Sequence, residues 1–437
     1  EWAMTKALDR WKTFKQVFTG IDWTLVLTVI LLVSAGLVLI YSATHRHYGD
    51  TYVMKQLSFF LVGVVLVVIV VAIPDHTFRQ SAEIVFLVSM ALVLMVYFFG
   101  TKAFGARRWL PILGMRIQPS EFLKVASILI LAKYAEYFKD RINSPVALLT
   151  LGGISGSAFL AILKQPDLGT AMTIMAITSG IVFIAGMDLV LMVCLFCLGA
   201  VPLLCPVFCV YMGWPVRFEA VGPLAAGIFL LFILVAVVAR LLRVNISLLT
   251  PLLICLALIG GILASPYLFE ELNPYQRLRL TSFLQPEADP RGSGYNLIQS
   301  MIAIGSGGFW GKGVYRGSQN VLGFLPHKHT DFIFSVLGEE CGFIGIALLI
   351  AALGMVLARS LIIATGAKDD FGTFVAVGVT SMFAFHFLVN IGMTVGMMPI
   401  TGLPLLFVSY GGSALLSSMF CLGLLLNVSL RRERFAF

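Results

Sequence analysis

The sequence contains few charged residues. Asp, Glu, Lys and Arg together make up 12% of its 437 residues, whereas a soluble domain averages about 25%. Long hydrophilic stretches are almost as scarce, because apolar runs of the roughly 20 residues needed to cross a bilayer recur along nearly the whole chain. These shortages exclude a water-soluble protein and leave no room for a separate soluble domain. We therefore expect an all-α, polytopic integral membrane protein in which residues 1–437 form a single domain.

Seven cysteines are present, and Cys194, Cys197, Cys205 and Cys209 are spaced like two pairs of ligands. They lie in or beside a run of Leu, Val and Phe, where cysteine commonly serves as a small apolar residue. We expect this role rather than a metal site or disulfides. The sequence shows no internal repeat of regular period.

Twelve apolar runs are long enough to predict spanning helices. Their expected bounds are 23–43, 54–73, 82–99, 120–137, 147–163, 169–186, 189–211, 222–240, 247–268, 331–358, 372–391 and 408–429. Between the ninth and the tenth run lies the one long hydrophilic segment, 269–330, and a loop of this length usually has a role. Within it, the apolar run from Leu297 to Ile304 is too short to span, which favours a helix at the membrane interface or a re-entrant segment.

Positive charges predict the orientation of these helices. The net charge of +8 would suit nucleic-acid binding in a soluble protein, but here it fits cytoplasmic loops and contact with anionic lipid or substrate. If both termini are cytoplasmic, the inner segments carry fifteen Lys and Arg residues and the short outer loops carry four. Two outer segments, 101–119 and 269–330, hold ten more, and these need a reason other than topology.

The first candidate site is the segment GARRWLPILGMRIQPSEFLK, residues 105–124. Arg107 and Arg108 are expected outside the membrane, and a helix is expected to open near them with Glu121 and Lys124 inside it. Residues three apart share a helix face, so these two can form an ion pair. Such a pair either fixes helix packing or faces a water-filled cavity. The two adjacent guanidinium groups favour a phosphate-containing ligand.

Two other polar segments are less specific. The segment KQPDLGTA, 164–171, is typical of a turn between two spans, with Asp167 capping the second. In the long segment, Arg277 closely follows a span and Lys312 comes later, within a mixed run of charges that is typical of a solvated surface.

The stretch HTDFIFSVLGEE, 329–340, carries charge where a helix is expected to enter the membrane. If the helix includes Asp331, small residues that allow close approach of a helix or a ligand follow on the same face. They are Ser335, Gly338, Gly342 and Gly345. A lone carboxylate at the membrane centre costs about 2.5–3.5 kcal/mol, so Glu339 and Glu340 should both have partners or water. The simplest role for Asp331 alone is a helix N-cap.

Five motifs in this chain together resemble one family. They are GARRWL with QPSEFLK, QPDLGTA, SMIAIGSGGFWGKG, HTDFIFSVLGEE and NIGMTVGMMPITGLPLLFVSYGGS, spread over more than half of the chain. Their order is similar to that of the SEDS family (shape, elongation, division and sporulation), which polymerises peptidoglycan in bacteria. The segments NIGMTVGMMPITG and DPRGSGYNLIQSMIAIGSGG resemble the elongation branch of the family more than its division branch.

The sequence departs from the family's pattern in three respects. His327 stands where the family usually has Glu after Leu-Pro, which removes one acid near the implied site. Leu406 and Ala414 replace a usual Pro and Ser. The family normally has ten spans, and the surplus is expected between about 189 and 268.

The resemblance implies a glycosyltransferase that polymerises lipid II during cell elongation. Asp331, the aspartate of the family's His-Thr-Asp motif, would be the general base for the attacking sugar hydroxyl. The pyrophosphate leaving group would be stabilised by Arg and Lys side chains, with or without a divalent cation (Mg or Mn). The substrate-binding residues implied in this way are Arg107, Arg108, Glu121, Lys124, Arg277, Lys312, His329, Thr330 and Ser409.

The resemblance also implies partners and a location. The expected partners are a class B penicillin-binding protein (a transpeptidase), lipid II and undecaprenyl pyrophosphate, without nucleic acid. The protein would lie in the bacterial plasma (inner) membrane, with its active site on the extracytoplasmic side. Two alternatives stay open, namely a lipid II flippase, which needs a basic cavity but no external base, and a non-catalytic scaffold for the transpeptidase.

Overall fold

The computed structural model describes residues 20–103, 106–112, 115–241, 249–272, 292–318 and 328–431, and five single positions between 277 and 286. These residues divide into two compact units. Unit 1 comprises Glu1–Ala185 and Asn296–Phe437, and unit 2 comprises Gly186–Tyr295. His327 and the Lys and Arg residues before residue 20 and after residue 431 lie outside the described residues. That the whole chain acts as one domain stays a prediction.

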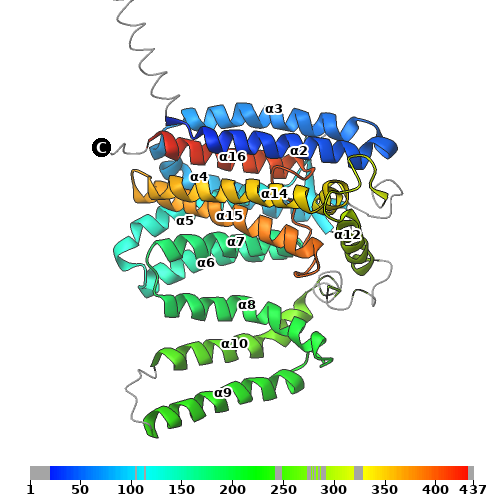
Figure 1. The fold of residues 1–437 in the computed structure, drawn as a ribbon. Helices are drawn as coiled ribbons and strands as arrows, with labels where there is room; N and C mark the ends of the chain where they lie inside the picture. Colours follow the sequence, from blue (N-terminus) through cyan, green and yellow to red (C-terminus); the bar gives the residue numbers. More distant parts are fainter. Residues whose placement is uncertain are drawn as a thin grey trace, which may run out of the picture. The chain divides into compact units, whose positions relative to one another are not determined.

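All twelve runs predicted to be helical are helical. In unit 1 the helices are α2 (Trp23–Tyr48), α3 (Thr51–Ala72), α4 (Asp75–Phe99), α5 (Pro119–Tyr137), α6 (Pro145–Leu163), α7 (Leu168–Ile184), α14 (Ile333–Thr365), α15 (Asp370–Thr394) and α16 (Gly412–Leu430) (Figure 1). Unit 2 contains α8 (Leu189–Tyr211), α9 (Phe218–Leu241) and α10 (Leu249–Glu271). The short run in the long segment forms α12 (Ser293–Gly307).

Fewer helices pass a strict test for spanning a membrane. Among the described residues, eight are long and apolar enough, or nine if the two bent halves of α8 form one span. Helix α7 is too short for that test, at 17 residues. Helix α5 contains four charged residues, which are Glu121, Lys124, Lys133 and Glu136. The chain is therefore a polytopic helical membrane protein, as predicted.

Helices α15 and α16 form the interior of unit 1. In each, 72% of the most apolar window is buried, against 17% in α3. Helix α15 packs against α5, α7 and α14, and α3 packs against α16 and α2 (Figure 1). From Leu61 to Ala72, the exposed side chains of α3 are all apolar, as expected for a helix that faces lipid. The polar residues of α5 and α15, by contrast, have neighbours inside the protein.

Polar caps fix several helix starts. The carboxylate of Asp22 accepts a hydrogen bond from the Leu25 amide at the start of α2, and Asp369 accepts one from Gly372 at the start of α15. Asp167 caps α7 through the Thr170 amide, at 3.3 Å, which confirms the predicted cap. Proline stands at the beginning of α5, where its missing N–H has no cost.

A small sheet interrupts the otherwise helical fold and was not predicted. Strands β1 (Thr101–Ala103), β2 (Ala106–Ile112) and β3 (Met115–Ile117) pair antiparallel in the order β1-β2-β3 between α4 and α5. The expected all-α fold is therefore only nearly all-helical. The strands are short and rich in charge, so they lack the period-two apolar pattern by which strands are recognised in a sequence.

Helix α14 contains a break that contradicts the predicted continuous helical face. Gly342 has φ 63° and ψ −158°, a conformation essentially confined to glycine. The loop after α12 contacts this break, with the amides of Lys312 and Gly313 donating to the carbonyls of Glu339 and Glu340 at 3.0 and 2.9 Å. Residues beyond Gly342 therefore do not continue the face that begins near Asp331.

Among the described residues of unit 2, α10 packs against both α8 and α9. Cys205 and Cys209 belong to a buried apolar cluster with Val221, Ala225 and Ile262. This environment agrees with the predicted role of these cysteines as small apolar residues.

Candidate functional site

The segment containing Asp331 lies at one end of unit 1, where α14 and α16 begin and α15 ends. We call this the Asp331 end. The side-chain amide of Asn390, near the end of α15, donates to the Asp331 carbonyl at 3.0 Å and to the Leu403 carbonyl at 2.7 Å. One buried amide thus fixes the backbone of Asp331 to the loop that joins α15 and α16.

Asp331 precedes helix α14 rather than capping it. The helix starts at Ile333, and Phe332 occupies the N-cap position without a side-chain cap hydrogen bond. The prediction that Asp331 is the N-cap of this helix is therefore wrong, because Phe332 occupies that position. The side chain of Asp331 is partly exposed, whereas the next nine residues are buried. Asp331 is thus the last accessible acid before α14 enters the protein.

Glu339 and Glu340 both have polar partners, as predicted. The Glu339 carboxylate pairs with Lys312 Nζ at 2.9 Å and accepts a hydrogen bond from Ser318 at 3.0 Å. Glu340 accepts a hydrogen bond from the Ser42 hydroxyl of α2. Both glutamates are almost fully buried. Glu339 therefore holds Lys312 in place and Glu340 connects α14 to α2, and neither carboxylate is exposed to an open cavity in this structure.

Lys328 is a further basic residue near these carboxylates that the sequence did not identify. It is only 7% exposed. Burial lowers the pKa of its ammonium group below the usual 10.5, and the charges of Glu340 and Glu339 oppose this effect. Lys312 and Lys328 thus place two cations near the carboxylates of Glu339 and Glu340. Lys312 lies far from Asp331 in the sequence. The one signal for Lys328 in the sequence is its position, three residues before Asp331.

The basic segment 105–124 and the turn 164–171 form one polar cluster. Arg108 donates to the carbonyls of Gln165 (3.3 Å) and Pro166, and its guanidinium lies 3.9 Å from the Asp167 carboxylate. Gln118 donates to the same carboxylate at 3.0 Å. The turn therefore positions an arginine as well as capping a helix, which its local sequence did not indicate.

The predicted Glu121–Lys124 ion pair exists, at 3.0 Å, inside the helix bundle. Lys124 Nζ also lies 2.9 Å from His386 Nε2 of α15, and Ser417 of α16 donates to Glu121 at 2.8 Å. Lys124 and His386 have no exposed surface. This network joins α5, α15 and α16 and favours the helix-packing interpretation that the sequence left open. Direct contact of Lys124 with a ligand would require a rearrangement.

The remaining predicted residues are distributed as follows. Arg107 lies in β2, and its side chain is outside the described residues. Arg277 lies in unit 2, where it donates to the carbonyls of Leu272 (2.8 Å) and Glu270 at the end of α10. Thr330 is partly exposed beside Asp331. The buried hydroxyl of Ser409 accepts a hydrogen bond from the Leu405 amide at 2.9 Å, which stabilises the loop before α16.

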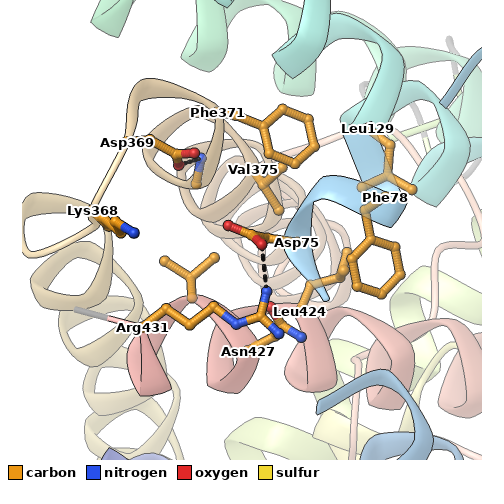
Figure 2. Close-up of a pocket in the computed structure, with 12 residues that line it drawn as sticks. Asp75, Phe78, Leu129, Lys368, Asp369, Phe371, Val375, Leu424, Asn427 and Arg431 are labelled. Atoms are coloured by element: carbon orange, nitrogen blue, oxygen red, sulfur yellow. Dashed lines mark hydrogen bonds and ion pairs between the residues drawn. The ribbon is translucent and has the colours of Figure 1, made fainter. Parts of the chain in front are cut away.

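A pocket at the opposite end of unit 1 is too small for a lipid-linked sugar. Figure 2 shows its lining, in which Arg431 forms an ion pair with Asp75 at 2.8 Å beside Lys368 and Asp369. Its volume is about 30 Å³, enough for one or two water molecules. Arg79 also pairs with Asp369 and Glu136 near this end. These ion pairs tie α4, α5, α15 and α16 together.

No metal site can be assigned within the described part of the chain. These residues contain no group of three or more His, Cys, Asp or Glu side chains that could hold a metal ion. We therefore derive no step through the divalent cation that the sequence left open.

The chain is an integral membrane protein with a bundle of spanning helices. At one end of this bundle lies a polar site with an accessible acid and nearby cations. The profile of the family described as "Cell cycle protein", which groups FtsW, RodA and SpoVE, matches residues 21–217 and 208–434. The chain belongs to this family, as its resemblance to SEDS proteins implied.

Relatives and solved structures support the same family over nearly the whole chain. The peptidoglycan glycosyltransferase RodA of Treponema pallidum is 37% identical, over 94% of this chain and 98% of its own length. The peptidoglycan glycosyltransferase MrdB of Escherichia coli K12 is 32% identical, over 94% of each chain. A chain of a peptidoglycan synthase complex has a TM-score of 0.65 at 27% identity, covering 95% of this chain and 99% of its own. The rod shape determining protein RodA of Thermus thermophilus shares the fold, with a TM-score of 0.61 at 24% identity and coverage of 95% and 98%.

Proposed function

We propose that this chain polymerises lipid II into glycan strands, with Asp331 as the general base. That the chain is a glycosyltransferase follows from its family and from near full-length relatives that are named peptidoglycan glycosyltransferases. The observation that carries the finer proposal is the position of Asp331. It is a partly exposed carboxylate, held by its backbone at the end of a spanning helix and followed by buried residues.

The reaction needs a base near the attacking hydroxyl and positive charge near the leaving pyrophosphate. The 4-hydroxyl of the incoming disaccharide gives its proton to Asp331 as its oxygen forms a bond to the anomeric carbon of the growing glycan. The bond from that carbon to undecaprenyl pyrophosphate breaks, and the pyrophosphate leaves with the electron pair. Because this leaving group is a weak base, it needs charge stabilisation rather than a general acid.

Lys312 and Arg108 are the accessible cations best suited to that charge, and the nearly buried Lys328 adds a positive charge near Glu339 and Glu340. Lys312 keeps 29% of its side chain exposed while paired with Glu339, and Arg108 keeps 19%. An accessible cation held by a buried carboxylate is already oriented, so less entropy is lost when an anion binds. Lys124, which is fully buried, acts in this proposal by holding α5, α15 and α16 in place.

The site suits a substrate that is part lipid and part sugar. A spanning helix that begins two residues after Asp331 allows the undecaprenyl chain to stay in the bilayer while the sugars lie outside it. We further propose that both termini are cytoplasmic, that the Asp331 end is extracytoplasmic in the plasma (inner) membrane, and that a class B penicillin-binding protein is the partner. The peptidoglycan synthase complex that resembles this chain supports a partner of this kind.

A polymerisation assay in detergent separates this function from its two alternatives. Purified protein with its transpeptidase partner is mixed with lipid II in micelles, where there is no membrane to flip across. We expect glycan strands, detected by gel electrophoresis. A flippase or a non-catalytic scaffold would produce none, and that result would refute the proposal.

A further inference from the structure

Three aromatic side chains from distant segments meet next to Asp331. Tyr52 is in the first turn of α3, His329 lies two residues before Asp331, and Tyr410 lies two residues before α16. The Tyr52 ring centroid is 4.7 Å from that of His329 and 4.9 Å from that of Tyr410, and the His329 and Tyr410 centroids are 5.7 Å apart. We call these three residues the aromatic platform. All three side chains are partly exposed.

Hydrogen bonds fix the aromatic platform relative to Asp331. The Tyr410 amide donates to the His329 carbonyl at 2.9 Å. Gln56, one helical turn after Tyr52, donates to the Ser409 carbonyl at 3.1 Å and accepts from the Gly411 amide at 3.2 Å. A buried glutamine therefore clamps the backbone on both sides of Tyr410. Because two residues span at most about 7 Å, the Cα atom of His329, to which both tyrosine rings pack, lies within about 7 Å of the Cα atom of Asp331.

We infer that Tyr52, His329 and Tyr410 bind the pyranose ring of the acceptor sugar whose hydroxyl Asp331 deprotonates. The inference rests on the proposed function, and it adds a subsite for one part of the substrate. The faces of aromatic rings are electronegative and attract the partially positive C–H groups of a sugar face. Tyrosine and histidine also offer polar atoms at the ring edge for sugar hydroxyls. Burial and the neighbouring Tyr52 raise the pKa of Tyr410, so its hydroxyl stays protonated at neutral pH.

A membrane-interface belt is the alternative explanation for tyrosines at helix ends. In such a belt the rings face lipid headgroups singly. Here Tyr52 and Tyr410 pack edge to face, with an interplanar angle of 80°, and both contact the histidine next to the proposed base. Helix α3 also exposes an apolar face elsewhere, as expected for contact with lipid. The packing favours a sugar subsite.

Leucine and phenylalanine substitutions test the aromatic platform. Tyr52→Leu and Tyr410→Leu remove the ring, and we expect each to raise the KM for lipid II about threefold to tenfold with a smaller effect on kcat. Tyr52→Phe and Tyr410→Phe keep the ring and lose only the hydroxyl, so each should raise the KM for lipid II less than the leucine variant at the same position does. Tyr137→Leu, an exposed tyrosine at the end of α5, is the matched control and should leave KM unchanged. Elution as a monodisperse peak in size-exclusion chromatography confirms that each variant is folded. If Tyr410→Leu does not fold, Tyr410→Met is used in its place.

A lipid-free competitor shows which part of the substrate is bound. The N-acetylglucosamine–N-acetylmuramic acid disaccharide should inhibit the wild type, and more weakly inhibit the leucine variants. Equal inhibition of both, or an unchanged KM in the leucine variants, would overturn the sugar subsite and leave an interface belt. The binding of labelled lipid II is also measured in the Asp331→Asn background, where chemistry is removed. If the wild type makes no glycan, the proposed function fails, and these binding constants still decide whether the aromatic platform holds a sugar.

Discussion

Lys124 and Lys312 each pair with a buried glutamate, but they differ in exposure. The side chain of Lys124 is 0% exposed and that of Lys312 is 29% exposed. A fully buried cation cannot reach a ligand without a rearrangement, whereas a partly exposed one can. The sequence predicted the Glu121–Lys124 pair because the two residues are three apart on one helix. It could not predict the Lys312–Glu339 pair, because 27 positions separate its members.

Loss of Lys124 should act on stability. Lys124→Met leaves the Glu121 carboxylate buried without its cation, which is expected to cost about 3–5 kcal/mol. Thermal unfolding in detergent measures the effect. The double variant Lys124→Met with Glu121→Gln should recover most of the loss, because no uncompensated charge stays buried. A double variant as unstable as the single one would contradict this explanation.

Lys328 should make the activity sensitive to alkaline pH. Burial lowers the pKa of Lys328 below 10.5. The ammonium group therefore loses its proton at a lower pH than free lysine does, and its positive charge is then no longer available to stabilise the leaving group in the proposed reaction. As the pH is raised, we expect the polymerisation rate to begin to fall at a pH lower than 10.5. Lys328→Arg stays protonated, so its rate should fall at higher pH. The unfolded chain binds the additional proton between the lowered pKa and 10.5, so the free energy of unfolding should rise with pH over this window in the wild type. If the polymerisation rates of the wild type and Lys328→Arg fell at the same alkaline pH, the proposed role of Lys328 in stabilising the leaving group would be excluded.

Among the structural elements, the helices and the capped turn before α7 were predictable, whereas the small sheet and the break in α14 were not. An apolar run of about 20 residues leaves few alternatives to a spanning helix. The strands around Arg107 are short and charged, and they form only because three segments pair with each other. The break at Gly342 depends on the loop after α12, 30 residues earlier, whose amides bond to α14. Likewise, the partners of Arg108 are 57 and 58 positions away.

Gly342 and Gly354 provide a matched test of the break in α14. A Cβ atom at Gly342 would lie 2.3 Å from the Gly311 amide nitrogen, and its φ is +63°, whereas at Gly354 nothing lies within 4 Å. We expect Gly342→Ala to lower the free energy of unfolding by about 1–3 kcal/mol from backbone strain alone. It should also lower polymerisation, since Lys312 is held at this break. Gly354→Ala should be neutral or stabilising. Equal effects in thermal unfolding would show that the break is not built into the native fold.

At the scale of the whole molecule, the polar residues gather at the two ends of unit 1. The Asp331 end contains the proposed base, the aromatic platform and accessible cations, and the opposite end contains ion pairs around a pocket that admits little more than water (Figure 2). Unit 2 contains residues 189–268, where we expect the spans beyond the family's usual ten. Its Arg277 is engaged with carbonyl groups of its own unit.

The two ends should face opposite sides of the membrane. Arg316→Cys introduces a thiol in the loop after α12, and Tyr137→Cys introduces one at the end of α5. A membrane-impermeant maleimide should label the first in intact spheroplasts and the second only after lysis. Cys194 and Cys341, which are partly exposed, are replaced by serine in both proteins beforehand. Labelling of Tyr137→Cys in intact spheroplasts would reverse the orientation and rule out an extracytoplasmic base.

The rate of lipid II polymerisation by Asp331→Asn tests the central claim most directly. Asparagine is nearly isosteric with aspartate, and the hydrogen bond from Asn390 is made to the backbone carbonyl at this position, which the substitution keeps. The variant should therefore fold, bind lipid II and bind its partner as the wild type does. Because a general base contributes about 10²–10⁴-fold to rate, we expect polymerisation to fall at least 100-fold at saturating lipid II. Glycan strands formed at a near-normal rate would contradict the role of Asp331 as the base.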